Sequence, residues 1–177
     1  MSDKPIPASY WVLPGQFLAG EYPSLPDNEP ATRQRLAAFI KEGFNTFLDL
    51  TCEGERRPYA PILMEMGMDE RPEFNHRRFS FVDFGVPSRT RMAFTLDAID
   101  SALAEGRKVY LHCVGGIGRT GTTVGCWFIR HGMEPEQALK HLGELYRTSA
   151  QSLFVPQSPE SSRQVEFILH WSEDGLA

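Results

Sequence analysis

The stretch that decides the fold is "KVYLHCVGGIGRT", residues 108–120. Its first part, up to Cys113, predicts a short strand, and residues 119–132 predict a helix that ends at a glycine. Three glycines separate the predicted strand from the predicted helix. Cys113 therefore lies where a strand ends and a loop begins, shortly before a helix.

The rest of the chain repeats this alternation of strands and helices. Residues 9–24 predict a hairpin of two short strands around a Pro-Gly turn, and Ser88 can cap a helix over residues 89–106. The same patterns predict strands at residues 45–52 and 76–84 and helices at residues 30–43, 59–67, 135–147 and 158–171. This alternation predicts an α/β protein with a central, mainly parallel twisted sheet of about four to five strands and helices on both faces. In such sheets ligands bind beyond the carboxyl ends of the strands, where Cys113 lies.

Composition excludes several classes of protein. The 177 residues include 41% hydrophobic and 23% charged residues, which are ordinary globular values, and no run approaches the roughly 18 apolar residues of a membrane span. The N-terminus lacks a basic region followed by an apolar stretch, so we expect a cytoplasmic protein with no membrane partner. Three cysteines argue against a disulfide scaffold, and a net charge of −5 disfavours nucleic-acid binding. We expect a monomer.

The loop after Cys113 has the chemistry of an anion site. Gly115, Gly116 and Gly118 let successive backbone amides turn inward, and the following helix adds its positive N-terminal end. Arg119 carries a planar fork suited to two phosphate oxygens. This field favours thiolate over thiol at Cys113, which makes the cysteine a candidate nucleophile.

Two neighbours of the loop have supporting roles in this hypothesis. We expect His112 to orient the loop by hydrogen bonds to the backbone rather than to act as a base. We expect Thr120 to donate its hydroxyl to the sulfur, which helps the sulfur to leave. The alternative is that Cys113 is an inert buried thiol in a tight turn. The glycines, Arg119 and the strand-helix context together disfavour that alternative.

The run from His112 to Thr120 resembles the signature of cysteine-dependent protein tyrosine phosphatases: His, Cys, five residues, Arg, then Ser or Thr. It looks like the dual-specificity or small prokaryotic branch, and the similarity in element order covers about residues 10–171. The resemblance implies a single phosphatase catalytic domain over residues 1–177, with a phosphatase-like fold and no metal or cofactor. It also implies phosphate binding by Val114, Gly115, Gly116, Ile117, Gly118 and Arg119. A rhodanese-like loop is usually shorter or lacks the arginine at this spacing.

A general acid is needed to protonate the leaving oxygen of a phosphate ester. Asp83, in "FVDFGVPS", lies thirty residues before Cys113, and its spacing to Gly85 and Pro87 resembles the general-acid loop of the family. The usual Trp-Pro before the aspartate is replaced by Phe-Val. The alternative is a solvent-exposed turn aspartate beside a helix cap. In the implied reaction Cys113 attacks phosphorus while Asp83 protonates the leaving oxygen, and water then attacks with Asp83 as base.

Three further residues are candidates for the site. Gln157 or Gln164 could position the hydrolytic water, although Gln157 could simply precede a helix capped by Ser158, and Gln164 could pack inside that helix. Cys52 follows a strand predicted to be parallel to residues 108–113, so both cysteines would lie at the same end of the sheet. We therefore hypothesise a reversible disulfide between Cys52 and Cys113.

The resemblance implies a phosphorylated protein or a small phosphomonoester as substrate, and the sequence leaves the choice open. The five residues between Cys113 and Arg119 are uncharged, which disfavours a highly anionic lipid headgroup. Tyr59 could line the entrance or only begin a helix, beside a basic pair at Arg56 and Arg57. A protein phosphatase acting on phosphotyrosine, and on phosphoserine or phosphothreonine, is the first expectation. A phosphatase of small-molecule, inositol or RNA phosphates and a non-catalytic phosphate-binding module are the alternatives.

Overall fold

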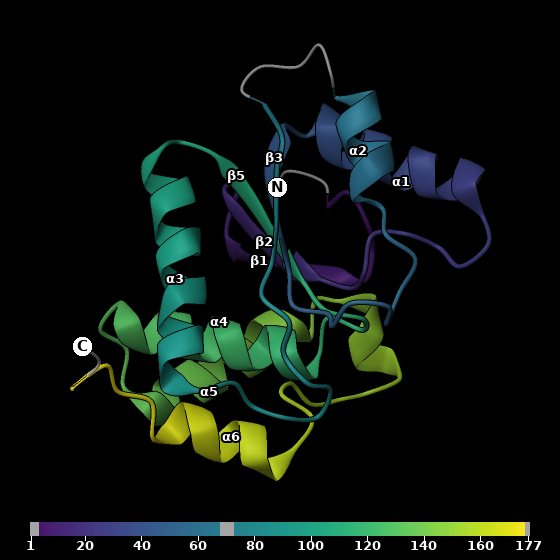
Figure 1. Ribbon diagram of the computed structural model, residues 1–177. Helices are drawn as coiled ribbons and strands as arrows, with labels where there is room; N and C mark the ends of the chain where they lie inside the picture. The colour runs from purple at the N-terminus through teal and green to yellow at the C-terminus, as the bar shows by residue number, and fades with distance from the viewer. Residues whose placement is uncertain (1–3, 68–72, 176–177) are drawn as a thin grey trace.

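The chain forms a five-stranded sheet between two groups of helices in a computed structural model that describes residues 4–67 and 73–175 (Figure 1). The strand order is β1-β2-β5-β3-β4, and only the β1-β2 pair is antiparallel. The strands are β1 (Ser9–Leu13), β2 (Phe17–Gly20), β3 (Phe44–Asp49), β4 (Asn75–Arg78) and β5 (Lys108–His112). The predicted α/β class and mainly parallel sheet are confirmed, and the predicted hairpin forms one edge of that sheet.

The parallel strands require helical connections, because a parallel pair cannot be joined by a tight turn. The helices are α1 (Glu29–Lys41), α2 (Ala60–Met66), α3 (Arg89–Ala104), α4 (Gly118–Arg130), α5 (Pro135–Tyr146), the short 3-10 helix η1 (Ala150–Leu153) and α6 (Ser162–Leu169). Ser88 caps α3 as predicted, since its hydroxyl accepts the Arg91 N–H at 3.2 Å. Among the described residues, no helix is both long and apolar enough to cross a membrane.

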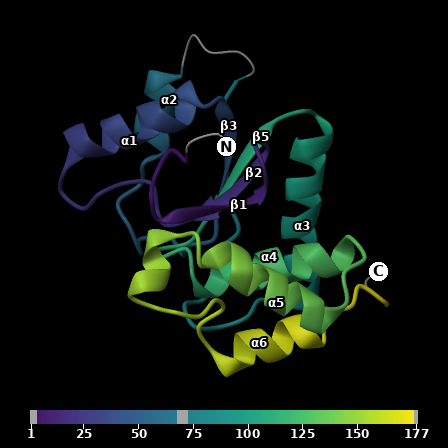
Figure 2. The ribbon, with the colours of Figure 1, turned by 180° about the vertical axis from the view of Figure 1, so that it is seen from behind.

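Each face of the sheet has its own apolar core. One core contains Leu36 and Phe39 of α1 and Leu63 of α2. The other joins the opposite face to α3, α4, α5 and α6, and it includes Met92 and Val124. Figure 2, seen from behind, shows α1 and α2 on one side of the strands and α3 to α6 on the other. The strands are therefore covered on both faces, which fixes them as a rigid platform.

One predicted strand is shorter in the structure. Residues 76–84 were expected to be extended, but β4 ends at Arg78. Two further hydrogen bonds run beside β3, from Phe79 N–H to Asp49 O at 2.8 Å and from Phe81 N–H to Leu50 O at 2.9 Å. Phe84 then adopts a φ of 54°, in the left-handed region that turns the chain. Asp83 consequently lies in a loop rather than in a strand.

The carboxyl ends of β2, β3, β4 and β5 lie at one edge of the sheet because these four strands are parallel. The loops after them bring together residues 21–28, 50–59, 79–88 and 113–117 (Figure 1). This edge holds the candidate site.

Candidate active site

The loop between β5 and α4 wraps around the sulfur of Cys113. Gly116 has a φ of 71°, and its backbone N–H donates to Cys113 Sγ at 3.3 Å. A Cβ at Gly116 would collide with the backbone of Gly20, so the loop and the end of β2 fit together only with glycine there. Cys113 itself is 3% exposed. The backbone thus directs a donor at the sulfur, which favours negative charge on it.

The guanidinium of Arg119 lies beside this loop and is almost fully occupied. Nη1 and Nη2 donate to the two carboxylate oxygens of Glu55 at 2.8 and 2.6 Å, and Nη1 also donates to the Phe81 carbonyl at 3.1 Å. Nη2 forms an ion pair with Asp83 Oδ1 at 3.0 Å. The Nε–H is buried and has no partner among the described residues. One donor therefore stays free in a group that is otherwise fixed.

Burial opposes the charge on Arg119, and acidic neighbours restore it. Burial lowers the pKa of Arg119, but the hydrogen bonds from Glu55 and the negative charges of Cys113 and Asp83 outweigh burial and raise it overall. In return, the hydrogen bond from Arg119 lowers the pKa of Glu55 against the opposing effect of burial. Both groups are therefore charged across the neutral range, as a bidentate pair requires.

His112 is a neutral, buried side chain that contacts the backbone at the start of the loop after β5. Its Nδ1 lies 3.2 Å from the Cys113 carbonyl and 3.9 Å from Asp49 Oδ1, and its Nε2 lies 2.6 Å from Tyr59 Oη. Carbonyl and carboxylate oxygens only accept, so Nδ1 carries the proton and Nε2 accepts from Tyr59. Burial lowers the pKa of His112 to about 4, although Asp49 opposes that shift. The ring contacts backbone and phenol, the placement expected of an orienting residue.

Asp83 is 53% exposed and lies at the site through its ion pair with Arg119. The Gly85 N–H donates to the Val82 carbonyl at 3.0 Å and closes the turn around Asp83. Val82 and Phe84, on either side, are 71% and 61% exposed. The structure therefore brings Cys113, Arg119 and Asp83 together from β5, α4 and the loop after β4.

The structure separates the two glutamine candidates. Gln164 is fully buried; its Oε1 accepts the Ser161 N–H and its Nε2 donates to the Gly85 carbonyl, both at 3.3 Å. It therefore joins α6 to the loop of Asp83. Gln157 is exposed and has no hydrogen bond within the described part of the chain. Ser158 does not cap the last helix: its hydroxyl donates to the Ile117 carbonyl at 2.8 Å, and Ser161 is the cap.

Two other expectations have mixed outcomes. The hydroxyl of Thr120 is buried and lacks a hydrogen-bond partner among residues 4–67 and 73–175, so the expected donation to the sulfur is not made. The sulfur accepts the Gly116 N–H instead. Cys52 is a free thiol that donates to the Phe81 carbonyl at 3.4 Å, the same oxygen that Arg119 uses. It lies in the region expected of it but carries no disulfide.

Sequence reasoning missed Glu55. Of the two alternatives for Tyr59 the structure supports the helix start, because Tyr59 is the N-cap residue of α2 and is fully buried. Glu55 binds Arg119 although it lies 64 positions earlier in the chain. Its position as a charged residue just beyond the end of a strand was the signal in the sequence that could have indicated a role in the site. Across the described residues no cluster of three or more His, Cys, Asp or Glu side chains is placed to hold a metal.

Comparison with known proteins agrees with this geometry. The small phosphatase Tk-PTP in its active form superposes with a TM-score of 0.71 at 21% identity, over 92% of this chain and 94% of that one. The *P. aeruginosa* protein TpbA, solved in complex with pTyr, gives a TM-score of 0.67 at 15% identity, over 99% and 91%. These two likenesses show that the chain shares the fold of these proteins.

Sequence comparison identifies the family. Residues 23–133 match the family described as "Polymorphic toxin system, DSP-PTPase phosphatase", and the chain belongs to this family. Protein tyrosine phosphatase domain-containing protein 1 of *Mus musculus* is 30% identical over 112 residues, which is 59% of this chain but 15% of the mouse protein. An uncharacterized protein of *Methanocaldococcus jannaschii* is 30% identical over 94 residues, 53% of this chain and 57% of its own length.

Proposed function

We propose that the protein is a cysteine-dependent phosphatase that removes phosphate from phosphotyrosine, and from phosphoserine or phosphothreonine, in proteins. The observation that carries this proposal is the convergence on one loop of a sulfur that accepts an amide N–H, an arginine with one free buried donor, and an aspartate within 3.0 Å of that arginine. This is the set of groups that phosphoryl transfer through a covalent intermediate needs.

In the first step Cys113 Sγ attacks phosphorus and the ester oxygen leaves with a proton from Asp83. The loop amides and Arg119 stabilise the charge on the three equatorial oxygens. Because Glu55 holds Nη1 and Nη2, the Nε–H of Arg119 is the donor available to the phosphate at once. Asp83 releases Nη2 as phosphate binds, which frees a second donor, and the released carboxylate takes up from solvent the proton that it gives to the ester oxygen.

In the second step water attacks phosphorus and gives a proton to the Asp83 carboxylate, and the sulfur leaves as a thiolate. The Gly116 N–H that donates to Cys113 Sγ stabilises the departing charge. The covalent intermediate divides the single difficult displacement by water into two easier ones.

A protein substrate is supported by the surroundings of Asp83. Val82 and Phe84 expose apolar surface on both sides of the acid, where they can contact the ring of a phosphotyrosine. The residues between Cys113 and Arg119 carry no charge, so the loop itself offers nothing for a second phosphate.

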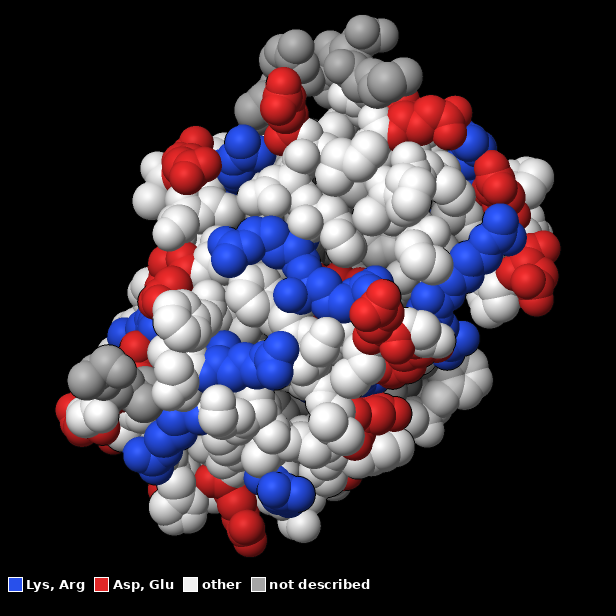
Figure 3. Space-filling view, viewed as in Figure 1, with Lys and Arg blue, Asp and Glu red and all other residues white. Residues whose placement is uncertain are grey.

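A second candidate is a phosphatase of inositol phosphates. An open pocket of about 240 Å³ includes Glu55, Arg56 and Arg57 in its lining, and it lies beside the site because Glu55 contacts Arg119. Lys and Arg side chains also gather in the middle of the face in Figure 3. One structural neighbour, PTPMT1, was solved in complex with PI(5)P; its TM-score is 0.66 at 18% identity, over 92% of each chain.

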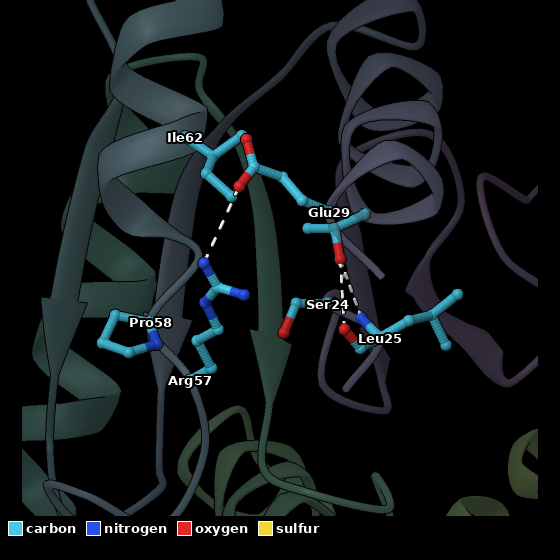
Figure 4. Close-up of a pocket in the computed structure, with 7 residues that line it drawn as sticks. Ser24, Leu25, Glu29, Arg57, Pro58 and Ile62 are labelled. Carbon is cyan, nitrogen blue, oxygen red and sulfur yellow. Dashed lines mark hydrogen bonds and ion pairs between the residues drawn. The ribbon is translucent and has the colours of Figure 1, made fainter. Parts of the chain in front are cut away.

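The adjoining pocket in Figure 4 cannot hold a substrate. Its volume is about 10 Å³, room for about one water molecule, and Arg57 pairs with Glu29 across it at 3.7 Å. Of these two pockets, only the larger has room for a second anion.

The deciding experiment measures hydrolysis of p-nitrophenyl phosphate by the wild type, Cys113→Ser and Asp83→Ala. We expect no turnover by Cys113→Ser and a drop of roughly 10²-fold for Asp83→Ala. Turnover that survives Cys113→Ser would overturn the mechanism. Phosphopeptides and inositol phosphates, assayed side by side, then distinguish the two substrate classes, and Arg56→Ala should weaken only the second.

A further inference from the structure

We propose that Leu153 and Phe154 form an apolar subsite for one aliphatic side chain of the substrate protein, a few residues from its phosphorylated residue. We call these two side chains the apolar rim. The inference rests on the proposed function and adds a sequence preference to the protein substrate proposed there.

The apolar rim is exposed and lies in an uncharged segment. Leu153 is 82% exposed and Phe154 is 81% exposed, the largest exposed fractions among the large hydrophobic side chains of the described residues. Residues 148–159 contain no charged residue, although charged residues make up 23% of the chain. An exposed patch of neighbouring apolar side chains is typical of an interaction surface.

The backbone beneath the apolar rim is fixed. On one side the Ala150 N–H donates to the Pro7 carbonyl at 3.0 Å. On the other side the Tyr146 hydroxyl donates to the Val155 carbonyl at 2.9 Å, and the Val155 side chain packs half-buried against the core. The two rim side chains therefore stay exposed on an ordered segment, and a partner can bind them without the cost of ordering that backbone.

Hydrogen bonds before and after the apolar rim connect its segment to the surroundings of the loop between β5 and α4. Gln151 Nε2 donates to Glu21 Oε2 at 3.0 Å, so η1, the short yellow-green helix in Figures 1 and 2, lies next to the loop after β2. A Cβ at Gly116 would lie 2.6 Å from the Glu21 backbone nitrogen, so Glu21 borders the loop of Cys113. The Ser158 hydroxyl donates to the Ile117 carbonyl at 2.8 Å. The apolar rim therefore lies between two attachments to the proposed phosphate site.

A peptide whose phosphate is held in this site can extend over the apolar rim. Leu153 lies two positions from Gln151, which is at most about 7 Å along the chain. An extended peptide advances ~3.3 Å per residue, so four residues on one side of the phosphorylated residue cover about 13 Å. An aliphatic side chain within that range can contact the rim while Arg119 and the loop amides hold the phosphate.

The charge and size of the apolar rim favour a peptide side chain over two other occupants. A surface that binds anionic lipids has basic residues among its apolar ones, and residues 148–159 contain none. Each partner in a stable dimer buries roughly 800 Å², far more than two side chains offer. One leucine-sized side chain needs no more surface than a leucine and a phenylalanine can provide.

The test measures kcat/KM for phosphotyrosine peptides that carry one leucine at a different position in each peptide, up to four residues on either side, in a serine and glycine background. We expect leucine at one or two positions, on a single side of the phosphotyrosine, to raise kcat/KM about 10-fold over alanine. The gain should appear mainly as a lower KM, because the contact is the same in the ground state and the transition state. Asparagine, which is close to leucine in size but polar, should give no gain at that position.

Variants of the rim connect this preference to the two side chains. Leu153→Ser and Phe154→Ser should each lower the ratio of kcat/KM between the leucine and alanine peptides, and the double variant should bring it from about 10 to near 1. Because both peptides are measured on the same variant, a general loss of folded enzyme does not change the ratio. Phe94→Ser is the matched control, since Phe94 is 63% exposed on α3, and it should keep the wild-type ratio.

The inference is overturned if leucine raises kcat/KM at no position or if the double variant keeps the preference. It is also overturned if the wild type sediments as a dimer, or binds phosphatidylserine vesicles, and the double variant does not, because a second copy or a membrane then covers the rim. If phosphopeptides are hydrolysed without any leucine preference, the proposed function stands and only this inference fails. Hydrolysis of p-nitrophenyl phosphate but of no phosphopeptide would refute the protein substrate of the proposed function, and the inference with it.

Discussion

Arg119 shows how one buried charge can be fixed and still remain able to bind. The Glu55 carboxylate accepts hydrogen bonds from Nη1 and Nη2 in a bidentate pair, and the Phe81 carbonyl accepts a second hydrogen bond from Nη1. A planar guanidinium held in this way cannot rotate without breaking two short hydrogen bonds. Its unpartnered Nε–H therefore has a fixed direction, which in the proposed reaction would reduce the ordering needed in the transition state.

Replacing the carboxylate that holds Arg119 should damage catalysis more than folding. In Glu55→Gln one oxygen becomes an amide nitrogen, which cannot accept from Nη1 or Nη2, so the guanidinium gains freedom. We expect kcat/KM for p-nitrophenyl phosphate to fall by roughly 10- to 100-fold, with most of the loss in kcat. Stopped-flow kinetics and thermal melting of the same sample measure the two effects.

The matched control for this variant is Glu53→Gln, because Glu53 is exposed two residues earlier in the same loop. It makes the same change in charge without touching Arg119, so it should retain wild-type kcat/KM. Equal losses of kcat/KM in the two variants would mean that catalysis depends on the overall charge of the loop rather than on the hydrogen bonds between Glu55 and Arg119.

Residue-level prediction from sequence worked where chemistry is local. Cys113 and Arg119 could be predicted because both belong to one short signature of neighbouring residues, His112 to Thr120. Glu55 could not, since its role depends on how the loop after β3 folds towards α4, 64 positions away. Thr120 was predicted to donate to the sulfur because it follows Arg119 in the signature, yet its hydroxyl makes no hydrogen bond to the sulfur. Spacing along the chain does not fix the direction of a side chain.

At the level of elements, the proposed phosphate-binding loop, residues 113–117 between β5 and α4, should depend on one glycine far more than on others with similar dihedral angles. Gly116 and Gly132 both have positive φ, 71° and 89°, but only a Cβ at Gly116 would collide with other atoms, those of the Gly20 backbone. We expect Gly132→Ala to cost about 1–2 kcal/mol of stability, the penalty of the left-handed conformation, with activity retained. Gly116→Ala should cost more and abolish most turnover.

Urea unfolding and p-nitrophenyl phosphate hydrolysis of the two variants make the comparison. The difference between them isolates the collision with β2, because the conformational penalty is shared. An active Gly116→Ala would show that the loop does not need its close approach to the end of β2.

The positions of two cysteines in the loops after β3 and β5 predict that oxidation joins them in a disulfide. Cys52 and Cys113 follow neighbouring parallel strands, and Cys52 Sγ donates to the carbonyl that anchors Arg119. Under mild peroxide we expect Cys113 to form a sulfenic acid, whose oxygen leaves as water when Cys52 attacks the sulfur. The resulting disulfide should be reversible by thiols and detectable by mass spectrometry.

Cys52→Ser removes the resolving thiol, so this variant should lose activity irreversibly and accumulate sulfinic acid at Cys113. Cys126, which is fully buried in α4, should stay reduced in both proteins and serves as the internal reference. Sulfinic acid at Cys113 of the wild type, with Cys52 still free, would contradict the pairing.

For the whole molecule, the alternation of strands and helices along the sequence was sufficient to predict the layered architecture. It was insufficient to predict where each strand leaves the sheet. Alternating strands and helices gave the parallel sheet and therefore the edge where Cys113 lies. Residues 76–84 alternate like a strand, but β4 ends at Arg78, only two hydrogen bonds continue beside β3, and the left-handed turn at Phe84 then forms the loop of Asp83. Gln164 of α6 donates to the Gly85 carbonyl in this loop, a contact between distant segments that no local pattern encodes.

His112 links the site to the stability of the whole fold. In the folded protein burial lowers the pKa of His112 to about 4, against an ordinary value of 6.5. The unfolded chain therefore binds more protons between these two values, and the stabilisation present above pH 6.5 is lost as pH falls towards about 4, by up to ~1.4 kcal/mol per pH unit. The pKa of Asp49 is lowered although burial opposes that shift. The stabilisation that Asp49 provides is therefore lost only as pH falls below 3.8, its ordinary pKa, which is outside this window.

Urea unfolding at pH 7.0, 5.5 and 4.5 should therefore show a falling free energy of unfolding in the wild type and a shallower fall in His112→Asn. Asparagine can still donate to the Cys113 carbonyl but cannot take up a proton. If His112→Asn does not fold, the ring proton resonances of His112 in the wild type give the same answer, because they should not shift between pH 7 and 5. A midpoint near 6.5, or equal pH slopes in the two proteins, would show that the ring beneath the phosphate-binding loop is not held neutral by burial.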